Sequence, residues 1–349
     1  MTDLGQLRLR DYRPVPCLSA PSRRVERACS PVIDAHTHLG RWLTGGTWAV
    51  SSTARLADLM DSCNIAAMVN MDGRWGGELE ANLDRYDRCY PGRFATFCHV
   101  DWAALADGEA GRLAASLADS VARGARGLKV WKDLGLHVRD RQGRLVLPDD
   151  PRLSPLWEQA AELAVPVAIH TADPVAFFEP VDERNERLEE LLDHPEWSFA
   201  DPAFPRFSQL MGSLEALVAD HPRTSFIGLH AGCNAEDIAW IDRMLATYPN
   251  FMIDIAARIS ELGRLPRRTR ALIMRHPDRA LFATDLIPPE RDTYEIYFRF
   301  LETDDEYFRY SPQDPPPTGR WFISALNLPA EVLRLVYSEN ARTLIPGLR

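Results

Sequence analysis

The 349-residue sequence has no long hydrophobic run, no apolar leader and no excess of positive charge. No segment approaches the roughly 20 apolar residues of a transmembrane helix, and residues 1–13 carry charges of both signs where a secretory leader would be apolar. The formal net charge is -10, from 40 Lys and Arg against 50 Asp and Glu. This balance disfavours nucleic acids and anionic membranes as partners. We therefore expect a cytoplasmic protein that acts on a small-molecule substrate.

The six cysteines show no CxxC or other ligand spacing, so neither a cysteine zinc site nor a disulfide framework is predicted. Scattered single thiols are typical of a reducing compartment. The sequence also lacks a glycine-rich turn after its first predicted strand, which argues against a dinucleotide-binding sheet. The cysteines are Cys17, Cys29, Cys63, Cys89, Cys98 and Cys233.

From Pro31 onward, short apolar runs alternate with helical patterns, and the runs start about every 30 residues, the length of one βα unit. Eight such units predict an α/β protein of the (β/α)8 TIM barrel class. The predicted strands are 32–38, 65–72, 94–100, 125–131, 165–170, 225–230, 251–255 and 280–285. The predicted helices include 54–63, 78–89, 112–123, 156–163, 210–220, 235–247 and 294–302, with Asn234 as the N-cap of the helix over 235–247.

Three segments flank or interrupt this repeat. Residues 1–30 are rich in proline and arginine and predict an extended N-terminal arm, so the barrel is expected to span 31–349. The interval after the fifth strand is lengthened by the aromatic and proline-rich residues 171–207. This long loop insertion is expected at the C-terminal face as a lid, although a packing flap or a dimer contact would explain it equally well. Residues 303–349 are expected to form a C-terminal cap.

The first predicted strand carries two histidines near its end, in Asp34-Ala35-His36-Thr37-His38. Side chains two residues apart share one face of a strand, so Asp34, His36 and His38 are expected on the same side. Asp34 is expected to orient a ligating histidine from a deeper position. An isolated His-x-His pair is more often a coincidence than a metal site. The interpretation therefore depends on further ligands.

Three more predicted strands end in side chains that bind metals, and the same alternation places all three inside the barrel. They are His170, His230 and Asp285. Barrels of this class carry their chemistry at the C-terminal rim. Imidazoles together with a carboxylate are suitable ligands for Zn²⁺, Mn²⁺ or Fe²⁺. The sequence therefore predicts a metal site built from four strands.

This set of residues resembles the amidohydrolase superfamily. It is most similar to the amidohydrolase-related (type 2) branch, which includes aminocarboxymuconate-semialdehyde decarboxylase, resorcylate decarboxylase and related lactonases and hydratases. The resemblance spans about residues 31–345. Beyond the first strand, the matching segments are Gly127-Leu128-Lys129-Val130, Leu229-His230-Ala231-Gly232, Ala283-Thr284-Asp285 and Glu339-Asn340-Ala341-Arg342.

The resemblance implies a fold, a cofactor and roles for the candidate residues. The fold is the barrel, and the cofactor is one divalent metal ion, with Zn²⁺ expected and Mn²⁺ or Fe²⁺ as alternatives. Barrels of this branch often pair, so a homodimer is a further expectation. His230 would handle protons as a non-ligand or weak ligand. The implied metal ligands are His36, His38, His170 and Asp285.

Lys129, Trp131 and Arg258 are candidate substrate contacts at the same rim. Lys129 should point into the barrel, where a buried amine requires a reason. It could be carbamylated to bridge two metals, hold a substrate carboxylate, or form an internal ion pair with Asp72 or Asp254. Arg258, after the seventh strand, is a second candidate anion contact, although a surface position is the commoner outcome for an arginine. Trp131 is a weaker candidate.

The ligand set leads to three hypotheses about function. A bound divalent ion lowers the pKa of its water from about 15.7 to near 7 and polarises a carbonyl. Asp285 would accept the proton of the attacking water, and His230 would act as general acid or base. The main hypothesis is a metal-dependent hydrolase of a small, carboxylated lactone, amide or similar carbonyl compound. The alternatives are a non-oxidative decarboxylase of an aromatic or unsaturated acid, and a binding barrel without chemistry.

Overall fold

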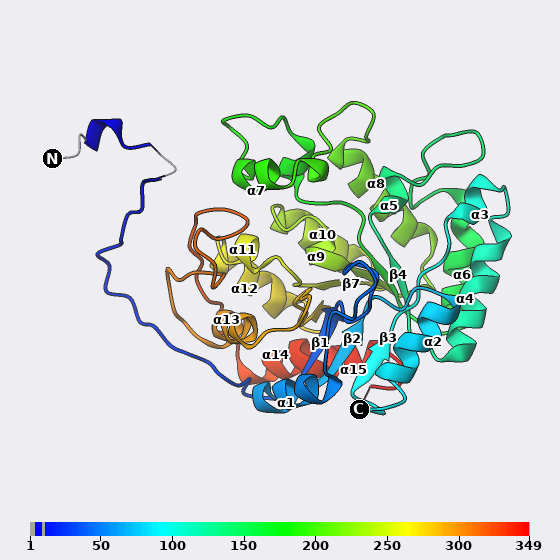
Figure 1. The fold of residues 1–349 in the computed structure, drawn as a ribbon, viewed down its shortest axis with the longest axis horizontal. Helices are drawn as coiled ribbons and strands as arrows, with labels where there is room; N and C mark the ends of the chain where they lie inside the picture. The colour runs from blue at the N-terminus through cyan, green and yellow to red at the C-terminus, as the bar shows by residue number, and fades with distance from the viewer. Residues whose placement is uncertain (1–3, 9–10, 349) are drawn as a thin grey trace.

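The computed structural model of the chain describes residues 4–8 and 11–348. Within these residues, eight short strands alternate with helices, in the order that the sequence pattern predicts (Figure 1). All eight strands end before the predicted position. The strands are β1 (Val32–Thr37), β2 (Ile65–Asn70), β3 (Phe94–Thr96), β4 (Leu128–Val130), β5 (Val167–Ile169), β6 (Phe226–Gly228), β7 (Phe251–Asp254) and β8 (Ala280–Leu281).

The strands close into a parallel (β/α)8 TIM barrel, which confirms the predicted fold class. β1 to β3 form one run and β4 to β8 form another, each in sequence order. A parallel bridge between Cys98 and Leu128 joins the two runs at β3 and β4. At the other seam, the backbone N–H of Asp285 donates to the His36 carbonyl (N···O 2.8 Å). The closing seam therefore joins the chain after β8 to the end of β1.

Two apolar layers follow from the alternation of side chains along the strands. The larger layer lies between strands and helices and includes Leu128 and Val130 of β4. The smaller layer fills the barrel, and alanines make up much of it. The α15 helix (Asn340–Leu344) and the residues after it close this inner layer. Its buried members are Ile33, Ala35, Ala67, Val69, Met71, Ala95, Phe97, Ala168, Ile227, Leu229, Ala256, Leu281, Ala283, Ala341, Ile345 and Leu348.

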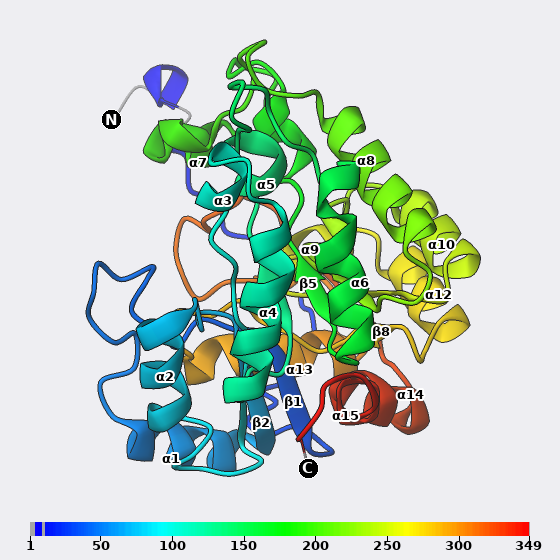
Figure 2. The ribbon, with the colours of Figure 1, turned by 90° about the vertical axis from the view of Figure 1, so that its right-hand side faces the viewer.

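Longer helices form the outer layer, one after each strand (Figure 2). The predicted helices are all present, with two corrections at their ends. α2 ends at Arg85, before the predicted end at Cys89. α10 is capped by the side chain of Asp237, which accepts two backbone N–H bonds, so Asn234 as its N-cap is wrong. The helices are α1 (Thr53–Cys63), α2 (Gly76–Arg85), α4 (Gly111–Arg123), α6 (Ser154–Glu162), α8 (Phe207–Asp220), α10 (Ile238–Thr247), α12 (Pro266–Arg275) and α13 (Arg291–Glu302).

Short helices occupy the loops at both ends of the barrel. Among the described residues, none of the helices is both long enough and apolar enough to cross a membrane. One of the short elements, η6, is a π-helical turn. These elements are η1 (Leu4–Gln6), α3 (Ala103–Ala106), α5 (Asp133–Leu136), η3 (Pro151–Leu153), η4 (Val175–Phe178), α7 (Leu188–Asp193), η5 (Pro195–Trp197), α9 (Leu229–Gly232), α11 (Ile259–Leu262), α14 (Ala330–Arg334), η6 (Leu335–Glu339) and α15.

The insertion over 171–207 packs around an apolar cluster of its own. Phe177, Leu191 and Phe199 are buried in this cluster, together with residues of α5 and α8. Figures 1 and 2 both show α7 at the end of the barrel opposite to α15. The buried Arg187 pairs with Glu261 of α11, which follows β7. The insertion is thus attached to loops on both sides of the C-terminal rim.

The segment before β1 runs outside the barrel, and its blue trace in Figure 1 reaches away from the body before it returns toward α1. Ion pairs and hydrogen bonds attach its last residues to the barrel. The guanidinium of Arg24 binds both carboxylate oxygens of Glu295 on α13 (2.6 and 3.0 Å). Residues 1–3 and 9–10 of the predicted arm, and residue 349 of the predicted cap, lie outside the described residues.

Aromatic rings hold the end of β8 against α13 and η6. Phe282 is fully buried, and its ring contacts those of Tyr297, Phe298 and Tyr337 at centroid distances of 5.8, 5.8 and 5.4 Å. Its backbone N–H donates to the Val336 carbonyl (2.9 Å). The chain leaves this cluster only a few residues before Asp285.

We expect Phe282→Ala to lower the free energy of unfolding by about 3–5 kcal/mol, because it removes a buried ring and leaves a cavity among aromatic neighbours that cannot collapse. Urea denaturation followed by circular dichroism measures the change. The control is Met274→Ala on α12, whose side chain is largely exposed and should change stability by less than about 0.5 kcal/mol. Equal effects of the two substitutions would show that this cluster is not a stabilising element.

Candidate metal centre

The candidate ligands meet at the C-terminal end of the barrel, but only His36 lies within a strand. His230 and Asp285 have left-handed backbone conformations, with φ of 57° and 66°. Strand alternation over 225–230 and 280–285 is therefore the wrong reason for their orientation, because a residue with positive φ has left the strand. Such conformations cost of order 1–3 kcal/mol each in non-glycine residues and cluster at functional sites.

The carboxylate of Asp285 contacts His36 in β1 and His38 directly after it. Its Oδ1 lies 3.2 Å from His36 Nε2 and 3.0 Å from His38 Nε2. One ligand atom from each of His36, His230 and Asp285 also lies within 4.8 Å of the other two. Donors that share one zinc ion lie about 2.0–2.2 Å from it. The separations of about 3 Å around Asp285 suit donors that converge on a single ion.

Two buried carboxylates fix the orientation of the His36 and His38 rings. His36 Nδ1 lies 2.9 Å from Asp254 Oδ2, and His38 Nδ1 lies 2.6 Å from Asp72 Oδ1. Each Nδ1–H donates to its carboxylate, which directs Nε2 toward Asp285. Ligating histidines in metal sites characteristically make this second contact to a carboxylate.

Asp34 does not have the role that strand alternation predicts. Its carboxylate accepts hydrogen bonds from the hydroxyls of Thr284 (2.5 Å) and Tyr294 (2.7 Å), and from the backbone N–H of His36. It therefore connects β1 to the chain after β8 and to α13. The pairing register of β1 with β2 shifts between Asp34 and Thr37, so simple alternation does not hold there.

His170 offers the observation that tests whether these residues fit a metal. Its Nε2 lies 3.3 Å from Asp173 Oδ1, whereas its Nδ1 is buried and has no hydrogen-bond partner. Buried polar atoms are nearly always paired, so an unpaired ring nitrogen indicates a missing partner. Its ring centroid is 4.5 Å from that of His230. The free Nδ1 fits a metal ligand whose other nitrogen is held by Asp173.

Protonation differs among these rings. Burial lowers the pKa of His170 to about 4 and that of His36 well below its usual value, so both are neutral. Burial alone would also lower the pKa of His38, but Asp72 and Asp285 outweigh it and raise that pKa to about 9. A divalent ion would take the place of the His38 proton, so its binding releases a proton and tightens as pH rises toward 9.

Lys129 lies inside the barrel on β4, beside these rings. Its amino nitrogen is buried, 3.4 Å from His36 Nε2, and burial lowers its pKa to about 8. Among the described residues, no carboxylate oxygen lies within 4.0 Å of it, so the ion pair with Asp72 or Asp254 is wrong. The Trp131 ring lies 5.2 Å from this amino group and 5.4 Å from the His170 ring.

A protein-family model described as Amidohydrolase (Amidohydro_2) matches residues 33–347. The chain belongs to this amidohydrolase family. This confirms the resemblance that the strand-end residues indicate. A search of the curated proteins gives no match for this amidohydrolase.

Solved structures of similar fold include two decarboxylases. A 2,6-dihydroxybenzoate decarboxylase from Rhizobium is 18% identical, with a TM-score of 0.55 and coverage of 90% of this chain and 98% of that one. A dihydroxybenzoic acid decarboxylase from Polaromonas sp., with bound manganese and 2-nitroresorcinol, is 16% identical, with a TM-score of 0.55 and coverage of 90% and 96%. An uncharacterized TIM-barrel protein from Bordetella bronchiseptica is 14% identical, with a TM-score of 0.56 and coverage of 90% and 98%. At these identities the likeness shows the barrel fold.

Arg258 of this amidohydrolase is buried rather than on the surface. Its Nη1 donates to the Ala257 carbonyl (2.8 Å). Although burial opposes the charge, nearby acids outweigh it and raise the pKa of Arg258, with Glu261 and Glu236 as the strongest. Acidic side chains therefore lie near the charge of Arg258, although no carboxylate oxygen of the described residues lies within 4.0 Å of its guanidinium.

Sequence reasoning missed two residues beside the centre, Trp42 and Arg74. The Trp42 ring contacts that of Trp131 edge to face, with centroids 5.2 Å apart, and the Arg74 guanidinium lies over Trp42 at 4.6 Å. The only sequence signal for Arg74 is its place in the loop directly after β2. A cavity of about 130 Å³ opens here, lined by Arg74, Trp75, His99, Val100, Asp101, Trp102, Ala103, Lys129, Trp131 and Asp133.

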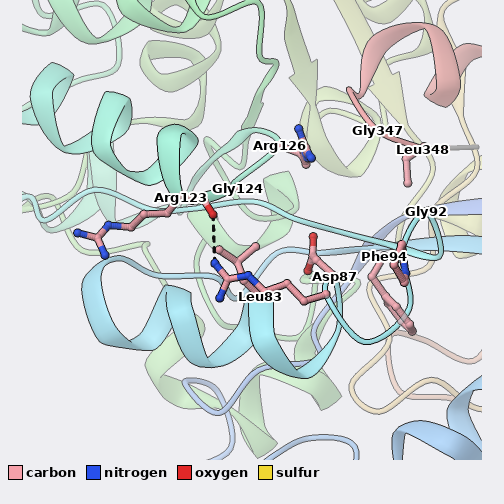
Figure 3. Close-up of a pocket in the computed structure, with 11 residues that line it drawn as sticks. Leu83, Asp87, Gly92, Phe94, Arg123, Gly124, Arg126, Gly347 and Leu348 are labelled. Carbon is pink, nitrogen blue, oxygen red and sulfur yellow. Dashed lines mark hydrogen bonds between the residues drawn. The ribbon is translucent and has the colours of Figure 1, made fainter.

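A larger cavity of about 480 Å³ lies at the other end of the barrel (Figure 3). It is bordered by Phe94, where β3 begins, and by Gly347 near the chain end. Arg88 donates a hydrogen bond to the Arg123 carbonyl (3.3 Å) at its edge. Because the ligand atoms lie beyond the opposite ends of the strands, this cavity is separate from the candidate metal centre.

We expect Asp72→Asn to weaken divalent-ion affinity about 10- to 100-fold, because the amide holds the His38 tautomer less firmly and makes Nε2 a poorer donor. Competition with a chelator measures the Zn²⁺ dissociation constant. Asp242→Asn is the matched control, since Asp242 binds His276 Nε2 (2.9 Å) in a similar pair at the outer helices. Equal effects in both variants, or none in Asp72→Asn, would argue against this arrangement of donors.

Proposed function

We propose that this amidohydrolase is a metal-dependent hydrolase of a small, carboxylated carbonyl substrate such as a lactone or an amide. The observation that carries the proposal is the position of Asp285. Its Oδ1 contacts both strand-one histidines, and its side chain is 27% exposed, whereas that of His36 is fully buried. Asp285 is thus positioned to meet both the ion and the incoming water or substrate.

The proposed metal ligands are His36 Nε2, His38 Nε2, His170 Nδ1 and Asp285. When bound, a divalent ion supplies Lewis acidity, which lowers the pKa of water and polarises a substrate carbonyl. Zn²⁺ is the proposed ion, with Mn²⁺ or Fe²⁺ as alternatives that the same donors accept. One ion is proposed, with Lys129 left as an uncarbamylated amine.

Asp285 and His230 are the proposed catalytic residues. Asp285 accepts a proton from the attacking water, which raises the nucleophilicity of the water oxygen. His230 donates its Nδ1–H to the Ala256 carbonyl (2.9 Å), and burial lowers its pKa well below the usual value. Its ring is therefore neutral, with Nε2 as an acceptor. His230 Nε2 then takes the proton from Asp285 and passes it to the leaving oxygen or nitrogen.

Lys129 and Trp131 are the proposed contacts on the substrate side, with Arg258 as a further contact. Lys129 is a buried cation beside His36, so it would orient a negatively charged oxygen of the substrate near the reacting carbonyl. Trp131 presents an indole surface next to His38 and His170, which suits a flat substrate.

Non-oxidative decarboxylation of an aromatic or unsaturated acid is the second candidate. It is favoured by the aromatic wall next to the donors, where Trp42 contacts both Trp131 and His99 edge to face. Two solved structures of similar fold are described as dihydroxybenzoate decarboxylases. In this reaction a proton replaces carbon dioxide on the ring carbon, and Asp285 or His230 would deliver it.

The same proposal includes the setting of the enzyme. We propose a cytoplasmic enzyme of small molecules, without nucleic-acid or membrane partners, that pairs as a homodimer. The negative net charge supports the absence of nucleic-acid and membrane partners.

A product assay separates the two reactions. Metal-loaded protein is incubated with a panel of lactones, acyl amides and hydroxybenzoates, and acid production and CO₂ release are recorded in parallel. We expect acid production from a lactone or an amide without CO₂. Release of CO₂ alone would establish the decarboxylase. If the protein forms neither product and binds no metal, the proposal that it is an enzyme is wrong.

The control for this assay is His230→Gln. It should lower kcat about 10²- to 10⁴-fold because the proton carrier is removed. Its metal content should stay near that of the wild type, since His230 is not among the four proposed ligands. If the variant also loses the ion, His230 is a ligand and its proposed role is wrong.

A further inference from the structure

The loop after β2 presents an arginine to the candidate metal centre in a fixed conformation. Asp72 of this loop holds the His38 ring. At Gly73 a Cβ atom would lie 2.3 Å from the Phe97 carbonyl oxygen, so only glycine permits this close approach. Arg74 then adopts a left-handed conformation with φ of 54°, and its carbonyl accepts the backbone N–H of His99 (2.9 Å). The loop is therefore fixed against β3 while its backbone is strained at Arg74.

The Arg74 guanidinium is held between two indoles. Its Cζ lies 4.6 Å from the Trp42 ring and 4.3 Å from the Trp75 ring. Its Nη1 also lies 3.4 Å from His99 Nδ1. The His99 Nε2–H donates to the Met71 carbonyl (2.7 Å), so Nδ1 is an acceptor that suits an arginine N–H. Stacking and this hydrogen bond fix the plane of the guanidinium, and the remaining N–H groups keep their donor capacity.

Arg74 differs from Arg258 in how its charge is balanced. Within the described part of the chain, no carboxylate oxygen lies within 4.0 Å of the Arg74 guanidinium. Burial lowers the pKa of Arg74, and the surrounding acids do not offset this effect. Around Arg258 the acids prevail and raise the pKa. Arg258 also has no carboxylate oxygen within 4.0 Å in the described part of the chain, but of the two arginines only Arg74 lines the cavity beside Lys129 and Trp131.

Two acids also line the cavity in front of Arg74, and both are engaged with backbone. Asp101 Oδ1 accepts the Ala103 N–H (3.1 Å), and Asp133 Oδ1 accepts the Leu134 N–H (3.0 Å). Burial raises the pKa of Asp133 to about 6, so this carboxyl takes up a proton more readily than an exposed one. Neither acid neutralises Arg74 by direct contact.

The cavity brings Arg74 together with Lys129 and Trp131, two residues that adjoin the proposed metal ligands. Its volume is about 130 Å³, and Lys129 and Trp131 line it together with Arg74. This volume is slightly less than the roughly 150 Å³ of a cavity that holds one benzene molecule, so the cavity is no larger than about a single ring. The Trp131 ring also contacts those of His38 and His170, at 6.0 and 5.4 Å. A flat molecule in this cavity would therefore contact Trp131 and Lys129 and lie within reach of Arg74.

We propose that Arg74 is the specificity-determining residue of this site and that it binds a carboxylate of a compact, flat substrate at the end remote from the reacting carbon. The proposal rests on the proposed function for the identity of the reacting end. It assigns the remote carboxylate to Arg74 rather than to Arg258, and it leaves Lys129 for the oxygens near the metal. It also limits the carboxylated portion to about one ring.

Equilibrium binding tests the subsite without requiring turnover. Benzoate and the neutral benzamide are titrated into the metal-loaded full-length protein, and binding is followed by calorimetry and by fluorescence of the indoles that line the cavity. We expect benzoate to bind about tenfold more tightly than benzamide, because a charge-assisted hydrogen bond is lost in the amide. In Arg74→Gln this preference should disappear. In Arg74→Lys it should become smaller, because lysine keeps the charge but lacks the paired N–H donors of a guanidinium.

The matched control is Arg85→Gln on α2. Arg85 also lies over an indole, that of Trp48 at 4.6 Å, but it does not line the cavity, so its loss should leave the preference for benzoate unchanged. Circular dichroism verifies the fold of each variant. The titrations are repeated after removal of the metal. The proposal is wrong if the preference for benzoate is lost when the metal is removed but is retained in Arg74→Gln. That result would show that the metal ion binds the carboxylate.

The two proposals can fail separately. The preference for benzoate could depend on Arg74 although no compound of the substrate panel gives a product. In that case the subsite is correct and the proposed reaction is wrong. If a carboxylated substrate is turned over with the same KM in Arg74→Gln and in the wild type, the reaction stands and the subsite is wrong. For a correct subsite, the variant should raise KM for the carboxylated substrate about tenfold and leave KM for its neutral amide nearly unchanged.

Discussion

The closing seam of the barrel is the constraint on which the candidate centre depends. Only where the chain after β8 meets the end of β1 do Asp285 and the first-strand histidines come together, since the Asp285 N–H donates to the His36 carbonyl while its carboxylate contacts both rings. The ring of Phe282 packs against α13 and η6 and supports this seam. Barrel closure and the arrangement of the donors therefore depend on the same contacts.

Buried carboxylates connect the metal donors to the substrate side. Asp254 and Asp72 fix His36 and His38, and Asp72 lies in the same loop as Arg74. The loop after β2, which approaches the chain after β3 closely at Gly73, thus has two functions. Its Asp72 orients His38, and its Arg74 lines the adjoining cavity. The left-handed backbones at Arg74, His230 and Asp285 are all beside this region. At these three residues the backbone strain lies where side chains leave the regular strand direction.

Much of the fold could be predicted from the sequence, because apolar periodicity and the spacing of the βα units depend on local composition. The types of the candidate ligands could also be predicted, since histidine and aspartate recur at strand ends. Their exact orientation could not. The turns at His230 and Asp285 are set by tertiary contacts, and the register shift in β1 directs Asp34 toward α13 instead of a ligand. The position of Arg74 could not be predicted, because its stacking partner Trp42 lies in another loop.

The most direct test of the central claim is X-ray absorption spectroscopy of the protein loaded with Zn²⁺. We expect a single zinc environment, with nitrogen and oxygen donors at about 2.0–2.2 Å and multiple-scattering features of three imidazoles, those of His36, His38 and His170. A protein that binds no zinc, sulfur among the donors, or a second metal about 3.5–4 Å away would contradict the proposed centre.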